Sequence, residues 1–225
     1  MKTVSMRMWL RSSTVAVVMG LLLFVPASTI DYWQAWAYFG IFVGASLSIT
    51  LYLMRKDPAL LKRREEGGPL AEKRAPQKIA MLFVSVGFTA ALIVPALDHR
   101  FGWSHVRPNA TVAGDVLVAL SFYIIFLVSK ENTFASARIE VSQDQRVISS
   151  GPYALVRHPM YVGLLLLFFG TPLALGSYWG LLTFALTLPG IIWRLFDEET
   201  LLAGNLPGYT EYCRKVRWRL IPAIF

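Results

Sequence analysis

Six ionisable residues beside two apolar segments are the strongest candidates for chemistry in this sequence. They are Arg157, His158, Arg194, Asp197, Glu198 and Glu199. Charge at or near hydrocarbon depth is costly, so an ionisable residue there is a functional candidate by default. We therefore expect residues 151–163, GPYALVRHPMYVG, and residues 194–199 to form one polar site at the rim of a membrane helix bundle.

Arg194 and Glu198 are four residues apart, so on a helix they share one face. A guanidinium holds an anionic group through a fork of donors, and a carboxylate accepts from an amine or a hydroxyl. A structural ion pair is the plain alternative. Glu199 points away from that face, and we expect it to support the site or to contact the C-terminal tail.

His158-Pro159 predicts a helix start, because proline is favoured in a first helical turn. The free N–H groups of that turn can bind a carboxylate. An interfacial histidine is the alternative for His158. Tyr153 and Tyr161 are either interfacial aromatics or the walls of a pocket for a cationic or aromatic ligand.

The composition indicates an all-α integral membrane protein. The 225 residues have a mean hydropathy of +0.50 and are 55% hydrophobic, and runs of about twenty apolar residues predict membrane-spanning helices. We expect a bundle of about five to six such segments with a cytoplasmic-side cofactor pocket. The expected spans are residues 12–30, 38–54, 79–97, 112–129, 161–175 and 178–193.

Two of these spans allow another interpretation. Residues 12–30 follow a basic start and could be a cleaved signal peptide, but the apolar remainder favours an uncleaved span. Residues 161–193 are either one helical hairpin or two full spans. We expect a single membrane domain, 1–225, with a four-span part, 1–130, and a catalytic part, 131–225.

The basic residues predict the orientation of the six spans. Alternate connections carry 20 and 2 of the 22 Lys and Arg residues, and the richer side is cytoplasmic by the positive-inside rule. We therefore expect a multi-pass protein of the cell inner (cytoplasmic) membrane with both termini cytoplasmic. Basic residues are not interleaved with exposed aromatics, which argues against nucleic acid. The lone Cys213 excludes an internal disulfide, and we expect no metal.

The polar segments between the expected spans give weaker indications of their secondary structure. Residues 58–66 are expected to be a short amphipathic helix on the membrane surface or a solvated loop. Residues 138–142 and 146–149 alternate in polarity, which predicts extended segments across the bundle face. Residues 98–109 are expected to be a loop in which His99 and His105 are interfacial.

Taken together, these motifs resemble the isoprenylcysteine carboxyl methyltransferase family, which is related to the phospholipid methyltransferases. The resemblance covers roughly residues 135–225. Its motifs are Gly151-Pro-Tyr, Arg157-His158-Pro159-x-Tyr161-x-Gly163, Arg194-x3-Glu198-Glu199 and Pro207-Gly208-Tyr209-x2-Tyr212. Members are integral-membrane enzymes that use S-adenosyl-L-methionine without a Rossmann domain. That fits the absence of a Gly-x-Gly-x-x-Gly fingerprint.

The resemblance implies a role for each matching residue. Glu198 would bind the cofactor, and Arg194 would hold the carboxylate of a lipophilic, isoprenylcysteine-like substrate. Eukaryotic members have a histidine where Gln145 stands. The residues that would line the S-adenosyl-L-methionine site are Gln145, Arg146, Val147, Ile148, Tyr153, His158, Pro159, Met160, Tyr161 and Glu198.

Three alternatives stay open on the sequence. A related methyltransferase could act on the amine of a phospholipid or on a thiol. An NADPH-dependent, sterol-reductase-like membrane oxidoreductase would share Tyr212-Cys213, although Pro159 favours methyl transfer. The protein could also be a non-catalytic bundle such as a small transporter. Many transporters are built from two repeated halves, and this sequence shows no such repeat.

Overall fold

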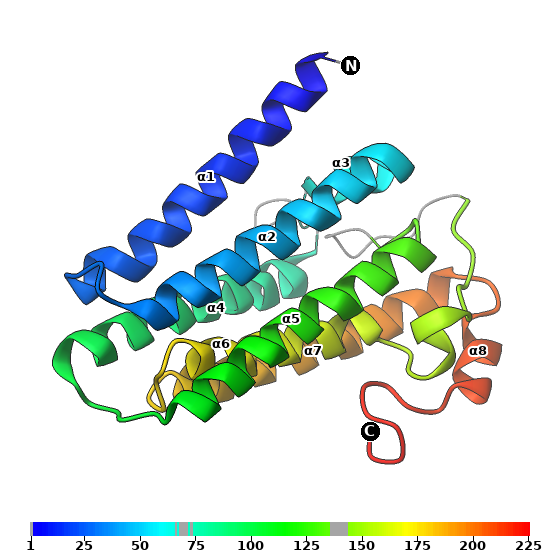
Figure 1. Ribbon diagram of the computed structural model, residues 1–225. Coiled ribbons are helices and arrows are strands. Elements are labelled where there is room, and N and C mark those ends of the chain that lie inside the picture. Colours follow the sequence, from blue (N-terminus) through cyan, green and yellow to red (C-terminus); the bar gives the residue numbers. More distant parts are fainter. Residues whose placement is uncertain (1, 66, 68–71, 73, 136–143) are drawn as a thin grey trace.

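The computed structural model describes residues 2–65, 67, 72, 74–135 and 144–225, and these form an all-helical bundle (Figure 1). No strand occurs in these ranges. The elements in chain order are α1 (Lys2–Ala27), α2 (Trp33–Lys56), α3 (Pro58–Glu65), α4 (Ala75–Phe101), α5 (Pro108–Glu131), the 3-10 helix η1 (Gly151–Ala154), α6 (Pro159–Ala174), α7 (Leu181–Asn205) and α8 (Tyr209–Lys215).

In the described part of the chain, four helices are long and apolar enough to cross a membrane, namely α1 from Trp9 onward, α2, α4 and α5. The first four expected spans are therefore confirmed as helices of spanning length. Helix α6 is a shorter apolar helix. It begins at Pro159, as the His158-Pro159 pair predicts.

Several expected boundaries are wrong, and the local backbone explains two of them. Helix α4 continues to Phe101, so Asp98 and His99 are helical and not in a loop. It ends where Gly102 adopts a φ of +65° and donates its N–H to the Asp98 carbonyl, a left-handed cap that glycine adopts without strain. Helix α7 begins three residues later than expected, after the turn at Gly176, where φ is +71°.

The polar connections agree with expectation in one place and not in another. Helix α3 confirms the short helix expected after Pro58. Residues 145–149 have no regular secondary structure, and the expected extended segment 138–142 lies outside the described residues.

Close helix contacts set the arrangement of the bundle. Helix α5 packs along α6, α4 along α7, α1 against α4, and α2 against α5. A Cβ atom added at Gly114 of α5 would lie 2.2 Å from the backbone nitrogen of Ala174. Only glycine therefore permits this approach, as is common where membrane helices pack backbone to backbone.

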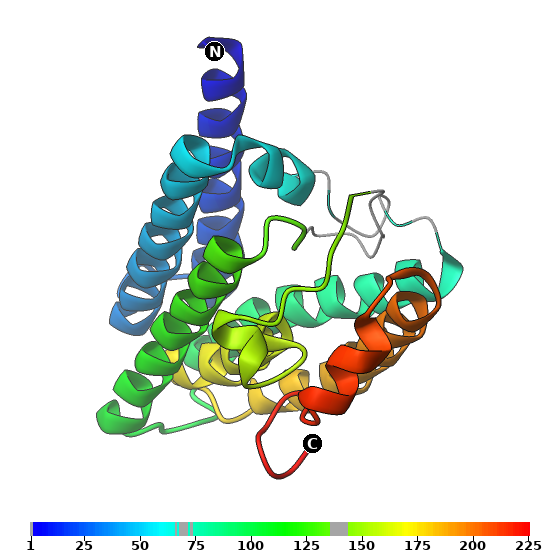
Figure 2. The same ribbon diagram turned by 90° about the vertical axis from the view of Figure 1, so that its right-hand side faces the viewer.

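The connections fall at two ends of the bundle. Figure 1 shows the N-terminus, α3, η1, α8 and the C-terminus at one end, and the α1–α2, α4–α5 and α6–α7 connections at the other. At the second end, buried Asp98 accepts hydrogen bonds from Ser104 and from the Ser177 hydroxyl, which joins two of these connections. Figure 2 views the first end, where α3, η1 and α8 lie.

Candidate functional site

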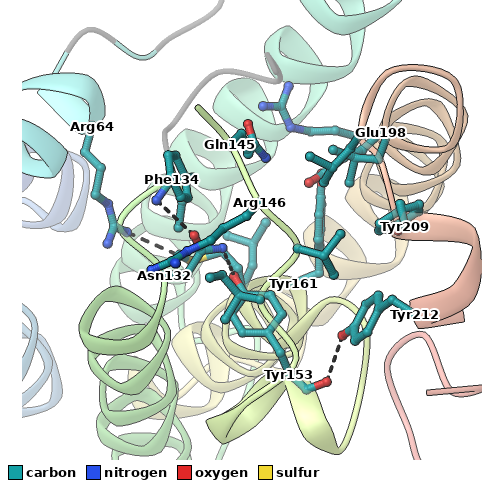
Figure 3. Close-up of a pocket in the computed structure, with 18 of the residues that line it drawn as sticks. Arg64, Asn132, Phe134, Gln145, Arg146, Tyr153, Tyr161, Glu198, Tyr209 and Tyr212 are labelled. Carbon is teal, nitrogen blue, oxygen red and sulfur yellow. Dashed lines mark hydrogen bonds between the residues drawn. The ribbon is translucent and has the colours of Figure 1, made fainter. Parts of the chain in front are cut away.

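A cavity of about 400 Å³ lies at the end of the bundle where α3, η1 and α8 gather (Figure 3). Its volume is within the range of roughly 300–1,000 Å³ typical of small-molecule pockets. The lining includes Arg64 of α3, Met81 and Val84 of α4, and Ile125 of α5. The pocket therefore draws on residues 1–130 as well as on the part 131–225, where the sequence analysis expects the catalytic residues.

Most of the sequence-predicted site residues line this cavity. They are Gln145, Arg146, Val147, Ile148, Tyr153, Met160, Tyr161, Arg194 and Glu198. His158 and Pro159 are not among the lining residues. The His158 ring is buried, and its Nε2 atom lies 3.1 Å from Glu199 Oε1. The two motif segments thus meet: His158 and Pro159 lie behind the cavity wall, and Met160 and Tyr161 of the same first turn form part of it.

Glu198 presents a carboxylate to the cavity in a fixed orientation. The Tyr161 hydroxyl donates to Glu198 Oε2 at 2.8 Å. Tyr161 is buried on the first turns of α6, and Glu198 belongs to α7. This hydrogen bond leaves the other carboxylate oxygen of Glu198 able to accept from a hydroxyl or an amine of a ligand.

Arg194 lines the cavity one helical turn before Glu198, but its guanidinium is already engaged. Arg194 Nη2 lies 2.7 Å from Glu72 Oε1, and Nη1 donates to Gln77 Oε1 at 2.8 Å. Both charged side chains are buried. Gln77 in turn donates to Asp197, which also pairs with Arg74. The sequence gives no sign of the roles of Glu72 and Gln77, because neither lies near residue 194 in the chain.

Glu199 joins the start of α6 to the C-terminal tail. Its carboxylate lies 2.9 Å from Arg157 Nη1 and 2.9 Å from Arg219 Nε, in addition to the contact with His158. The backbone repeats this connection, because the Arg157 N–H donates to the Trp218 carbonyl at 2.9 Å. The expected contact between Glu199 and the tail is present, and it supports the cavity without lining it.

Three further tyrosines surround the cavity. The Tyr212 hydroxyl donates to the Tyr153 carbonyl at 2.7 Å, and Asn132 donates to the Tyr153 hydroxyl at 2.9 Å (Figure 3). Burial, with a smaller contribution from the nearby Glu198 carboxylate, raises the pKa of Tyr153 to about 12, so this ring stays neutral. Tyr209 also lines the cavity.

These residues suit a ligand that carries a positive charge and an aromatic group. Tyrosine faces attract cations, and the Glu198 carboxylate complements a cationic or hydrogen-bonding group. Tyr209 and Tyr212 stand in one of the sequence motifs, but the motif alone indicates no role for either ring. Arg64 and Asn132 could not be predicted, because they lie in polar stretches where no periodicity distinguishes one residue from its neighbours.

Comparisons with known proteins identify relatives of this chain. Residues 109–206 match the family model described as phospholipid methyltransferase. A probable protein-S-isoprenylcysteine O-methyltransferase of Oryza sativa subsp. indica is 31% identical over 146 residues, which cover 61% of this chain and 72% of the rice protein.

Two further relatives share shorter regions. The protein-S-isoprenylcysteine O-methyltransferase of Schizosaccharomyces pombe is 32% identical over 81 residues, or 33% of each chain. The cobalt-zinc-cadmium resistance protein CzcN of Cupriavidus metallidurans is 30% identical over 128 residues, so the match spans 55%, about half, of each chain.

Proposed function

Because this chain belongs to the membrane methyltransferase family that includes isoprenylcysteine O-methyltransferases and phospholipid methyltransferases, we propose that it transfers a methyl group from S-adenosyl-L-methionine to a lipophilic acceptor. The observation that carries this proposal is the cavity in which Glu198 and the tyrosines converge. Family membership also favours methyl transfer over the oxidoreductase alternative.

The donor, when bound, supplies a methyl group on a positively charged sulfur. In our proposal Glu198 accepts a hydrogen bond from the donor while Tyr161 holds the carboxylate in place. Tyr153, Tyr209 and Tyr212 provide neutral aromatic walls that favour a cation. Gln145, Arg146, Val147 and Ile148 cover the donor from the loop before η1.

We propose a carboxylate of an isoprenylcysteine-like molecule as the favoured acceptor. The names of the rice and fission-yeast relatives support this choice, and apolar lining residues such as Ile125 and Leu164 suit a lipophilic chain. Attack by a carboxylate on the methyl group brings opposite charges together. A cavity that excludes water lowers the barrier by removing the solvent that stabilises the separated ions, and positioning contributes further.

A phospholipid amine is the second candidate acceptor, because the matching family model is that of phospholipid methyltransferases. A thiol acceptor would need the same donor geometry. Labelled methyl transfer separates the three classes when the protein is offered an S-farnesylcysteine derivative, a phosphatidylethanolamine vesicle and an alkyl thiol in parallel. Base-labile methyl incorporation identifies the carboxyl ester.

Substitution of Glu198 tests the donor site directly. We expect Glu198→Gln to weaken binding of S-adenosylhomocysteine at least tenfold in calorimetric titrations of the detergent-solubilised protein, because a charge-assisted hydrogen bond is lost. Glu211→Gln, an exposed change on α8, is the matched control. Wild-type affinity in Glu198→Gln would contradict the proposed role.

We also propose six spans, formed by α1, α2, α4, α5, α6 and the first part of α7, with both termini and the cavity on the cytoplasmic side of the inner membrane. The distribution of Lys and Arg supports this orientation. In a Cys213→Ser background, an impermeant maleimide should label Asn109→Cys in intact cells and Lys62→Cys only after permeabilisation. The reverse pattern would invert the topology.

A further inference from the structure

Among the residues that the structure describes, three arginines line the cavity, and their electrostatic environments differ. Arg194 is buried against the Glu72 carboxylate at 2.7 Å. Arg146 is exposed on the loop before η1. Arg64 reaches the cavity from α3 and is partly buried.

Arg64 is held by neutral groups. Its Nη1 atom donates to the Ser129 hydroxyl, and its Nη2 atom lies 3.9 Å from the Met160 sulfur. Ser129 is itself buried and donates to the Ile125 carbonyl at 2.6 Å, which fixes the oxygen that Arg64 contacts. No acidic side chain within the described part of the chain forms an ion pair with Arg64.

A guanidinium in this position favours an anionic ligand. A charged group removed from water is costly unless it is paired, and a thioether sulfur is a weak acceptor. Burial lowers the pKa of Arg64, and the nearby Tyr153 opposes part of this shift. Arginine nevertheless stays protonated in proteins. Figure 3 shows Arg64 and Glu198 on opposite sides of the cavity, an arrangement suited to a ligand with separated opposite charges.

We propose that Arg64, and not Arg194, binds the ligand carboxylate in this cavity. A fork of guanidinium donors matches a carboxylate in two parallel hydrogen bonds, whereas Arg194 already has an acidic partner in Glu72. The inference rests on the proposed methyl-transfer function. Two ligands could supply the carboxylate, namely the amino-acid end of the methyl donor and the acceptor.

The first arm of the test examines the donor. S-adenosylhomocysteine and its decarboxylated analogue are titrated by calorimetry into the full-length protein in detergent. If the donor supplies the carboxylate, wild type prefers S-adenosylhomocysteine by about tenfold or more, and Arg64→Gln removes that preference. The double variant Glu72→Met with Arg194→Met, which removes the Arg194 guanidinium without leaving Glu72 unpaired, retains it. Arg63→Gln is the control, because this neighbour has the same charge but does not line the cavity.

The second arm examines the acceptor. An S-farnesylcysteine derivative and its carboxamide compete as inhibitors of labelled methyl transfer. If the acceptor supplies the carboxylate, Arg64→Gln removes the preference for the acid by about tenfold or more while the donor preference is unchanged. Arg64→Lys keeps the positive charge but lacks the paired guanidinium donors, so it should retain part of the preference for the carboxylate in either arm. This variant also provides the test if Arg64→Gln does not fold.

The outcomes separate this inference from the proposed function. If wild type discriminates in neither arm, or if Arg64→Gln and Arg64→Lys discriminate as wild type does in both arms, the assignment of Arg64 is overturned. Methyl transfer can persist in either case. Failure of wild type to bind S-adenosylhomocysteine at all would instead refute the proposed function.

Discussion

Substitution of Glu72 would reveal whether Arg194 serves the fold or the ligand. Glu72→Gln keeps the size of the side chain but removes the carboxylate that lies 2.7 Å from Arg194. Glu72 and Arg194 are 3% and 8% exposed, so water cannot replace the lost charge at low cost. We therefore expect a loss of stability, and not a selective loss of acceptor binding.

The burial of both groups sets the size of the effect. Removing one partner of a buried ion pair costs about 3–5 kcal/mol. For a chain of this length, each kcal/mol shifts the thermal midpoint by roughly 2–4 °C, so the apparent midpoint should fall by roughly 6–20 °C. The double variant Glu72→Met with Arg194→Met should recover most of that loss, because replacing both partners of a buried pair with apolar residues is often nearly neutral.

The shift in the thermal midpoint is measured by heating the detergent-solubilised protein at a fixed scan rate and recording its tryptophan fluorescence. Arg74→Gln is the internal control. Arg74 pairs with Asp197 in the same network, but its side chain is 40% exposed, and exposed pairs contribute about 0–1 kcal/mol. An unchanged midpoint in Glu72→Gln, together with weaker binding of a carboxylate acceptor, would refute this reasoning and return Arg194 to the role of carboxylate ligand.

Three further substitutions test the packing and the site. Gly114→Ala should reduce the yield of monodisperse protein in size-exclusion chromatography, because its Cβ would lie 2.2 Å from an α6 backbone nitrogen, whereas Gly44→Ala has no atom within 4 Å and should behave as wild type. Tyr161→Phe should weaken S-adenosylhomocysteine binding by about threefold to tenfold in calorimetry, since Glu198 loses a hydrogen bond of about 0.5–1.5 kcal/mol. Glu199→Gln should speed tryptic cleavage of the C-terminal tail, because the contact that joins the tail to α6 is weakened. An unaltered cleavage rate would show that the backbone contacts suffice.

The sequence alone could predict the elements that carry the site. Apolar runs of spanning length require helices, because a backbone in hydrocarbon must satisfy its own hydrogen bonds. His158-Pro159 fixes the start of α6 through the locked φ of proline. The spacing of Arg194 and Glu198 places them on one face of α7, and both line the cavity.

Side-chain contacts between segments far apart in the chain could not be predicted from hydrophobic patterns and residue spacing. Glu72 lies next to Arg194, and Arg64 lies beside Ser129, only because segments that are distant in the sequence come together at one end of the bundle. The period of hydrophobic residues determines which face of a helix is buried. It carries no information about which side chain of another helix meets that face, so tertiary packing alone decided which guanidinium is neutralised and which remains for an anionic ligand.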